Sequence, residues 1–405
     1  MMDEQEVVII GAGIAGLATP RAGFEPAVKE KVENTGGVVV WGWAGFAVLL
    51  RGALRARRSC FPKLLEKALF ECAGWVTNVE TGTTQVTSFT GTSKCGDLGV
   101  RGLHRKVLLE ALAEELPPNT VRFSSKLASI KTETLKDSST VALLELEDGT
   151  LIRAKAVIGC DGVHSVVAQW LGLSGPIDSG RAAVRGLSVF PQGHGFDHEV
   201  RQFVKQGKRA GFLPLNDTDV YWFTTHYAAE EKELAVGDPL SIQREVTNNL
   251  AKSFPPEFLR VVHQADLSTL SWAPLKYRVP WALVTGQAHK GPITVAGDAF
   301  HPMTPDLAQG GGAALEDAVV LARNLAAAGL SNAERGVEQY VKERRWRAVG
   351  LIIGAYLSGW VQQGGRAGLS GWAVNWFRDH VFYRFVQPKI VDSVQYDCGV
   401  LPSVA

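Results

Sequence analysis

Small residues follow the first apolar run of this 405-residue chain at a spacing that suits the binding of a phosphate. Val7–Ile10 is entirely apolar and precedes a turn of the form G-x-G-x-x-G, with Gly11, Gly13, Ala15 and Gly16. Glycines here let the backbone amides of a helix N-terminus approach a pyrophosphate, whose charge the helix dipole stabilises. Glu30 lies 19 positions after Gly11, close to the spacing of a carboxylate that binds a ribose. Alone, the glycines would indicate only close packing and Glu30 a solvated carboxylate, but together they predict a dinucleotide site.

Two later turns place acidic residues and glycines after apolar runs in the same way. An Asp-Gly pair at Asp161 follows Leu151–Ile158, Asp298 follows Ile293–Ala296, and Gly310–Gly312 opens a helical pattern. A carboxylate at the end of a strand can accept hydrogen bonds from a polyol, and free amides at a glycine-rich helix start can approach a ligand. An Asp-Gly turn alone is common in α/β proteins. Three such turns in one chain predict a single nucleotide-binding cleft.

Pro20 interrupts the helix that should follow the first glycine turn. Proline has no amide hydrogen to donate and its ring crowds the preceding turn, so we expect a helix that begins near Ile14 to be short or bent. A pyrophosphate needs only the first turn of that helix, which lies before Pro20. We therefore expect the site to bind its ligand.

The order of the apolar runs indicates an α/β fold with an insertion. Strand and helix patterns of the nucleotide-binding type occur at 27–31, 103–116, 121–123, 141–147, 151–158, 293–296 and 313–327. Alternating segments between Ser174 and Val284, such as 220–227, predict an antiparallel sheet with one helical stretch near 242–253. We predict a Rossmann-like nucleotide-binding domain built from 1–75, 100–173 and 285–341. An inserted, mainly antiparallel β-sheet substrate domain takes 76–99 and 174–284, and a helical C-terminal region takes 342–405.

Composition restricts the class of partner. The chain is 46% hydrophobic and 20% charged with a formal net charge of +1, so no large field would attract nucleic acid or an anionic membrane as the main partner. Five cysteines contain no C-x-x-C pair, which argues against a disulfide framework and a structural metal site. A small-molecule partner is the expectation.

Two segments bear on location. The first ten residues show neither a secretory signal nor a transit peptide, so a cytoplasmic location is expected. Residues 348–365 carry no charge, but five glycines, Ser358, Gln362 and Gln363 make them a poor transmembrane span. We predict a buried helix there, and peripheral membrane contact is the alternative.

The motifs together resemble those of the group A flavin monooxygenases of the aromatic hydroxylase type. The resemblance is carried by the glycine turn, by Cys160–Ser165, by Gly297–Pro302 and by Arg105 at the start of its helix. Longer stretches resemble the plant branch related to salicylate hydroxylase and zeaxanthin epoxidase, namely 209–223, 301–322 and 396–401. The resemblance covers nearly the whole chain and implies that the nucleotide domain binds FAD.

The family's FAD contacts can be carried over to matching positions. By this resemblance Glu30 would hold the adenosine ribose, and Arg105 the phosphate or ribityl region. Asp161 would lie on the pyrophosphate side, and Asp298 would bind the ribityl chain. The flavin ring would lie against Gly311 and Gly312.

This chain departs from the family pattern near both ends of that cofactor. Relatives have about one more turn in the first helix and an alanine in place of Pro20. An arginine that follows the segment matching 32–34 is absent here, Ala308 replaces a glycine, and Phe300 replaces a small residue. We expect weaker FAD binding than in relatives.

The resemblance also implies a reaction. NADH or NADPH would reduce bound FAD, dioxygen would be captured as a flavin hydroperoxide, and one oxygen atom would hydroxylate or epoxidise a small apolar or aromatic substrate. Two other interpretations stay open on the same residues. The chain is either a reductase that passes hydride to its substrate without oxygen, or a degenerate paralogue with weak or lost FAD binding.

Candidate substrate residues come mainly from one aromatic segment. Four of them form either the walls of a dry pocket or ordinary sheet core: Leu213, Tyr221, Trp222 and Phe223. His226 would be a base for a phenolic substrate or an ordinary strand residue. Arg209 would pair with a substrate carboxylate or cap a loop, and Pro302 is expected near the flavin. No catalytic residue is assigned from the sequence.

Overall fold

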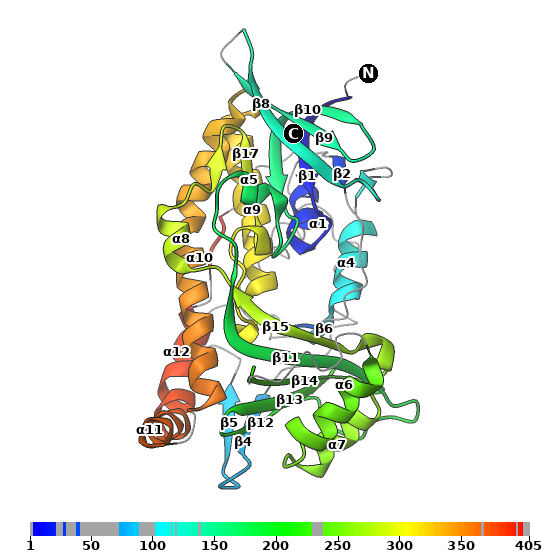
Figure 1. Ribbon diagram of the computed structural model, residues 1–405, viewed down its shortest axis with the longest axis vertical. Helices are drawn as coiled ribbons and strands as arrows, with labels where there is room; N and C mark the ends of the chain where they lie inside the picture. The colour runs from blue at the N-terminus through cyan, green and yellow to red at the C-terminus, as the bar shows by residue number, and fades with distance from the viewer. Residues whose placement is uncertain are drawn as a thin grey trace.

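The computed structural model describes residues 3–21, 27–29, 38–40, 73–88, 102–114, 116–117, 120–136, 139–228, 238–365, 368–393 and 396–399. Within these ranges the chain forms two large sheets, each with its own helices (Figure 1). The fold is mixed α/β with a helical C-terminal region, as the sequence predicts.

The first sheet is mainly parallel and has the strand order β16-β17-β10-β1-β2-β7. Its strands are β1 (Asp3–Ile10), β2 (Ala27–Lys29), β7 (Val121–Arg122), β10 (Leu151–Gly159), β16 (His289–Lys290) and β17 (Ile293–Val295). A hairpin of β8 (Leu127–Thr134) and β9 (Thr140–Leu146) extends it from β10. Val8 and Ile158 are fully buried because helices cover these strands, which explains their continuous apolar runs.

Helices surround this sheet and share its hydrophobic core. They are α1 (Ile14–Arg21), α4 (Arg105–Glu114), α5 (Val166–Trp170), α8 (Pro280–Thr285) and α9 (Gly310–Ala328). The helix α1 has eight residues and contains Pro20 in its last turn, so the prediction of a short first helix is confirmed. A small pair of strands, β3 (Val38–Val40) and β6 (Gly102–His104), leads into α4.

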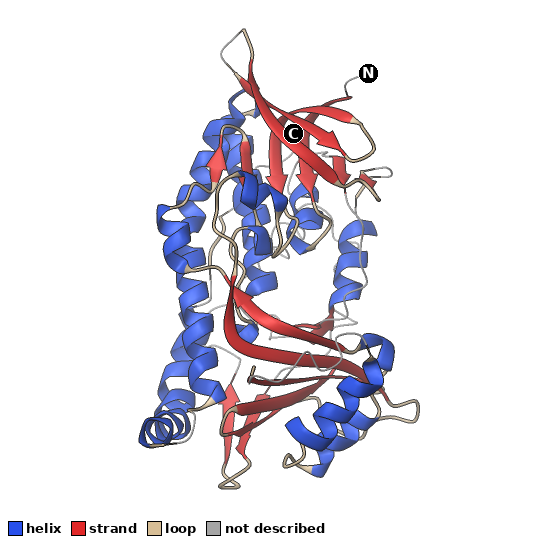
Figure 2. Cartoon of the chain, in the orientation of Figure 1, coloured by secondary structure: helices blue, strands red, loops and turns tan. Residues whose placement is uncertain are grey.

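The second sheet has the order β15-β11-β14-β13-β12-β4-β5 and is antiparallel except where β12 pairs with β4. Its strands are β4 (Ala73–Asn78), β5 (Thr84–Ser88), β11 (Ile177–Val189), β12 (Val200–Lys205), β13 (Lys208–Pro214), β14 (Asp219–Tyr227) and β15 (Ser271–Tyr277). One face packs on α6 (Pro239–Glu245), the π-helical Val246–Leu250 and α7 (Pro256–His263) (Figure 2). The expected antiparallel insertion and its helical stretch are therefore confirmed.

The C-terminal region is dominated by one long helix. The helix α10 (Ala333–Gln363) runs along one side of the molecule and contacts elements of both sheets (Figure 1). It is followed by α11 (Leu369–Phe377), the π-helical Arg378–Val386 and α12 (Gln387–Ser393). In the described part of the chain, no helix combines the length and the apolar character needed to cross a bilayer.

Candidate active site

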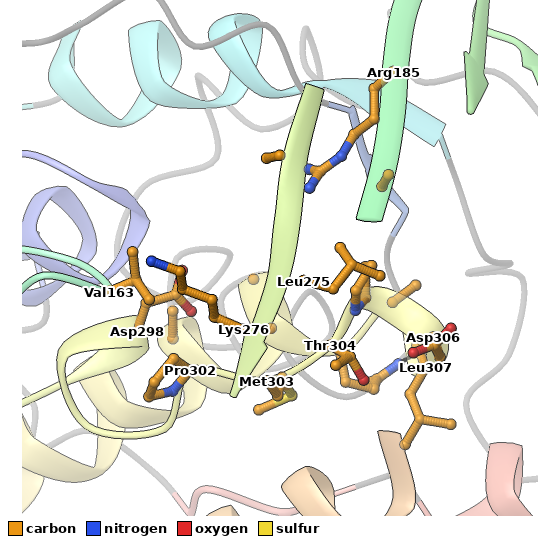
Figure 3. A pocket seen from close by; sticks show the side chains of 18 of the residues that line it. Val163, Arg185, Leu275, Lys276, Asp298, Pro302, Met303, Thr304, Asp306 and Leu307 are labelled. Atoms are coloured by element: carbon orange, nitrogen blue, oxygen red, sulfur yellow. Dashed lines mark hydrogen bonds between the residues drawn. The ribbon is translucent and has the colours of Figure 1, made fainter. Parts of the chain in front are cut away.

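A cavity of about 650 Å³ lies between the two sheets and brings together residues from distant parts of the chain. Figure 3 shows Asp298, Pro302 and Asp306 along one loop, with Arg185 extending from β11. Nine of the binding residues predicted from the sequence line this cavity: Gly13, Ala15, Arg105, Arg209, Tyr221, Phe223, Asp298, Pro302 and Gly311. The glycine turns and the substrate sheet therefore face one space.

The first glycine turn is shaped by contacts that exclude any side chain. Gly11 has φ +109°, and a Cβ atom there would lie 2.3 Å from the carbonyl oxygen of Cys160. At Gly16 a Cβ atom would lie 1.8 Å from the carbonyl oxygen of Gly11. A Cβ at Gly13 would meet only the Cys160 oxygen, at 3.8 Å, and Gly13 opens into the cavity. Gly11 and Gly16 thus shape the turn, while Gly13 and Ala15 present its backbone to the cavity.

Asp161 lies outside the cavity lining and uses its carboxylate to cap α5. It accepts hydrogen bonds from Ser165 Oγ at 2.5 Å and from the amides of Val166 at 2.7 Å and Val167 at 3.3 Å. Burial raises the pKa of this carboxyl above its ordinary value, although these hydrogen bonds oppose the shift. Gly162, next to Asp161, lines the cavity in its place. Asp161 therefore orders the second turn rather than contacting the cavity directly.

Asp298 points into the cavity from a loop whose other residues are buried. It lies in a short 3-10 turn, Gly297–Ala299, and is exposed, whereas Ala299 and Phe300 are completely buried. Gly297 has φ +62°, which a glycine adopts without strain. This turn directs the carboxylate of Asp298 toward the cavity.

The buried carboxylate of Asp317 in α9 holds this loop in place. It accepts a hydrogen bond from the Gly297 amide at 2.8 Å, and His301 Nε2 lies 2.6 Å from the same oxygen. Its other oxygen accepts from Arg344 Nε at 2.7 Å. Burial would raise the pKa of Asp317, but its contacts with His301 and Arg344 outweigh this effect and hold the pKa below its ordinary value. Asp317 therefore acts as a charged anchor beneath the Asp298 turn.

The helix α9 begins at the cavity with a run of glycines. Gly311 lines the cavity, whereas Gly312 is buried in the helix and does not. A Cβ atom added at Gly310 would meet nothing within 4 Å. The first amides of a helix have no intrahelical partner, so they are available to a ligand and carry the positive end of the helix dipole.

The cavity face of the second sheet follows from the alternation of side chains along β14. Tyr221, Phe223 and Thr225 line the cavity, while Trp222 faces the helices on the opposite side. Trp222 is fully buried, with its ring 6.2 Å from that of Phe258.

Three of the candidate pocket residues do not line the cavity. Trp222 and His226 lie on the sheet face away from the cavity, and Leu213 is buried in β13 without lining it. The His226 ring packs 5.1 Å from that of Trp272. Burial, with a smaller effect of Lys208, lowers the pKa of His226 to about 4. His226 is thus placed as a neutral strand residue and not as a base in the cavity.

A buried ionic cluster forms one end of the cavity. Asp306, whose side chain is 1% exposed, accepts two hydrogen bonds from Arg181 at 3.0 and 2.7 Å and one from Arg209 at 3.4 Å. Arg209 also donates to Gln202 at 3.0 Å and lies over the Phe223 ring at 5.3 Å. Burial lowers the pKa of Arg209, and Asp306 opposes that shift. Two guanidinium groups share one carboxylate, which leaves this end of the cavity positive.

A glycine of α10 permits this cluster. A Cβ atom at Gly359 would lie 2.1 Å from Asp306 Oδ2 and 2.4 Å from Arg181 Nη2. The helix therefore approaches the ion pair more closely than any other residue would allow.

Several cavity residues were not predicted from the sequence. Among them are Arg185 on β11, Gln202 on β12, Lys276 on β15 and the buried Asp306. Period-two alternation starting from Arg181 could have placed Arg185 on the cavity face. No local signal pairs Asp306 with Arg181, because the two residues are 125 positions apart. Glu30, expected at the ribose, lies outside the described residues.

Comparison with known proteins agrees with this arrangement. Residues 71–353 match the model of the FAD binding domain family FAD_binding_3. Monooxygenase 2 of Arabidopsis thaliana is 37% identical over 98% of this chain and 98% of its own length. The chain belongs to the FAD-dependent monooxygenase family. It is therefore an oxidoreductase.

A second curated relative and a solved structure are also similar to most of this chain. Monooxygenase 1 of Arabidopsis thaliana is 36% identical over 88% of this chain and 91% of its own length. The crystal structure of Klebsiella pneumoniae HpxO complexed with FAD and uric acid has a TM-score of 0.77. That structure covers 96% of this chain and 95% of its own, at 19% sequence identity, which shows a shared fold.

The cavity fits the FAD of this monooxygenase family on the geometry described above. Backbone at Gly13 and Gly311 is open to the cavity, and neither position has a side chain that would block a ligand. Two helix N-termini present amides that would suit the anionic parts of the cofactor, and Asp298 would suit its hydroxyl groups as an acceptor.

Proposed function

We propose that the chain is an FAD-dependent monooxygenase that uses NADH or NADPH and dioxygen to hydroxylate or epoxidise a small apolar or aromatic substrate. The observation that carries this proposal is the single cavity that is lined both by the glycine turns and by the face of the second sheet. The names of the Arabidopsis relatives, and the uric acid bound by HpxO, support a monooxygenase acting on a small molecule.

Each end of the cofactor has residues suited to it. The amides at the start of α1, at Gly13 and Ala15, would hold the pyrophosphate, with Arg105 beside them. Asp298 would accept hydrogen bonds from the ribityl hydroxyls, and amides at Gly311 would face the pyrimidine end of the ring, where negative charge is stabilised. Glu30 is proposed for the adenosine ribose. FAD, when bound, supplies the electron transfer and the activation of dioxygen.

The remaining cavity offers apolar walls and one polar end for a substrate. Tyr221, Phe223, Leu275 and Met303 exclude water from the space next to Pro302, which protects a reactive oxygen species from side reactions. Arg209, already bonded to Asp306 and Gln202, is fixed in position and can donate to an oxygen atom of the substrate. The protein's contribution is therefore orientation and exclusion of water.

A cofactor titration tests the site. Replacing Asp298→Asn should weaken FAD binding about tenfold, because one charge-assisted hydrogen bond contributes about 1.4 kcal/mol. Asp217→Asn is the matched control, because its carboxylate is 94% exposed and lies in a turn next to the second sheet. FAD affinity is measured from the quenching of flavin fluorescence. Equal affinity in both variants would remove Asp298 from the cofactor site.

Oxygen consumption tests the reaction. The FAD-loaded protein should consume dioxygen and a reduced nicotinamide in equal amounts when a suitable aromatic substrate is added. Nicotinamide oxidation coupled to substrate but without oxygen uptake would indicate a reductase. A preparation that no added FAD renders yellow would indicate a degenerate paralogue and would overturn the proposal.

A further inference from the structure

The helix α10 has two contrasting faces. Ser358 and Gln362 line the cavity on one side. On the other side Trp346, Ile353, Leu357 and Trp360 are 66%, 43%, 52% and 47% exposed. The spacing i, i+7, i+11 and i+14 places these four side chains in one stripe, about 21 Å long at the rise of an α-helix.

The next two elements of the chain, which contact α10, also expose large apolar side chains. Leu369, Trp372 and Trp376 on α11 are exposed by 89%, 66% and 49%. Phe377 and Phe385, at the end of α11 and in the π-helical segment, are also exposed. We define the tryptophan face by these nine residues: Trp346, Ile353, Leu357, Trp360, Leu369, Trp372, Trp376, Phe377 and Phe385. Large apolar residues gathered on one surface mark an interaction site.

The described charged side chains next to the tryptophan face are mainly basic. The sequence contains no aspartate or glutamate between Arg345 and Arg378. Arg384 and Lys389 are exposed nearby, and the guanidinium of Arg384 lies 5.2 Å from the centroid of the Phe385 ring. Asp379, the next acidic residue, is held by Arg378 and Asn78. Within the described part of the chain, Arg384 and Lys389 therefore border the apolar surface, and the carboxylate of Asp379 is paired with Arg378.

This charge pattern selects among possible occupants. In a symmetric dimer the same surface would meet itself, which would bring the exposed cations of the two copies close together. Anionic lipid headgroups complement the cations, and tryptophan rings are enriched where hydrocarbon meets water. Lysine and arginine stems can lie along apolar surface while their charges reach the headgroups.

We propose that the tryptophan face docks on the surface of a lipid membrane that contains anionic headgroups. The protein lies on the bilayer and does not cross it, with α10 and α11 inserted at the level of the headgroups. Since Ser358 and Gln362 of α10 line the cavity, this helix separates the cavity from the lipid. This goes beyond the proposed oxygenation and does not depend on it.

Flotation of the full-length, FAD-loaded protein with vesicles tests this inference. Vesicles of phosphatidylcholine alone are compared with vesicles of phosphatidylcholine mixed with phosphatidylserine, at low and high salt. The protein should float with the mixed vesicles, less with the neutral ones, and less at high salt because the charges are screened. Absence of flotation, or equal flotation with both kinds of vesicle, overturns the proposal.

Paired variants exclude a general effect of surface hydrophobicity. The triple variant Trp360→Ser, Trp372→Ser and Trp376→Ser should lower the partition onto mixed vesicles on the order of a hundredfold. The control triple variant Val86→Ser, Phe123→Ser and Leu240→Ser removes residues that are 61%, 57% and 46% exposed on other elements and should bind like the parent.

Two further measurements complete the test: light scattering gives the oligomeric state, and flavin absorbance gives the FAD content. Both triple variants should keep the parent's FAD content, which shows that they fold. If the parent is a dimer that only the tryptophan-face variant dissociates, the face binds a second copy and the membrane proposal is wrong.

Discussion

The two ends of the cavity are built in different ways. The cofactor end consists mainly of backbone, namely glycine turns and helix N-termini, with the side chains of Asp298 and Arg105 beside them. The substrate end consists of side chains that alternate along strands and is closed by the ionic cluster of Arg181, Arg209 and Asp306. A site built from backbone atoms changes little when side chains are substituted, so related proteins can bind the same ligand there. A site built from side chains can be altered by single substitutions. The comparison predicts different responses to substitution at the two ends.

The cofactor end should give the largest effect with the smallest change. Gly16→Ala places a Cβ atom 1.8 Å from a backbone oxygen, so we expect a loss of at least about 4 kcal/mol of folding stability and no retained flavin. Gly13→Ala is the control, because its Cβ has 3.8 Å of space. That variant should fold within about 1 kcal/mol of the parent yet bind FAD less tightly. Denaturant unfolding and flavin titration measure both; equal stability of the two variants contradicts the packing argument.

The substrate end should respond to a change of charge. Asp306→Asn leaves two buried guanidinium groups without their carboxylate, and we expect a loss of about 3–5 kcal/mol in unfolding free energy. Asp298→Asn is the matched control, because its exposed carboxylate should change stability without FAD by about 0.5 kcal/mol or less. If both variants unfold at the same denaturant concentration, the cluster does not stabilise the sheet.

Acid should destabilise the substrate sheet through His226. The pKa of His226 is about 4 in the folded chain, below the ordinary value of 6.5. Between these two pH values the unfolded chain binds a proton at His226 and the folded chain does not. The contribution of His226 to the free energy of unfolding is greatest above pH 6.5. It falls by about 3 kcal/mol as the pH drops to 4, and below pH 4 it stays constant. Unfolding of the parent and of His226→Gln is compared across this range. A constant difference between them from pH 7 to pH 4 would show that His226 does not carry this dependence.

The smallest effect is expected at the loop that joins the two ends. Ala308 has φ +54°, a left-handed conformation that costs free energy in any residue with a Cβ atom. Ala308→Gly should raise stability by about 0.5 kcal/mol, after the greater flexibility of the unfolded chain is subtracted. Ala326→Gly, at an exposed position inside α9, should instead lower it by about 1 kcal/mol. The paired melting temperatures should shift in opposite directions.

The sequence predicted the cofactor end better than the substrate end for a physical reason. Gly16 is required by a contact with Gly11, five positions earlier, and Gly11 and Gly297 have positive φ angles next to strand ends, so a local pattern reveals all three. Tyr221 and Trp222 are both aromatic, and only the register of β14 decides which one faces the cavity. The Asp306 cluster joins three elements that are distant in sequence, and Asp161 has a capping role that spacing alone did not distinguish from a ligand contact.

The long helix α10 limits how this molecule can move. It contacts β17 and α9 on the cofactor side and β12 and β13 on the substrate side, as one uninterrupted helix of 31 residues. Because this rigid helix is packed against both sheets, it opposes a hinge motion of one sheet relative to the other. We expect reactants to enter and products to leave through rearrangement of loops and side chains at the rim, while the two sheets keep a constant separation throughout turnover.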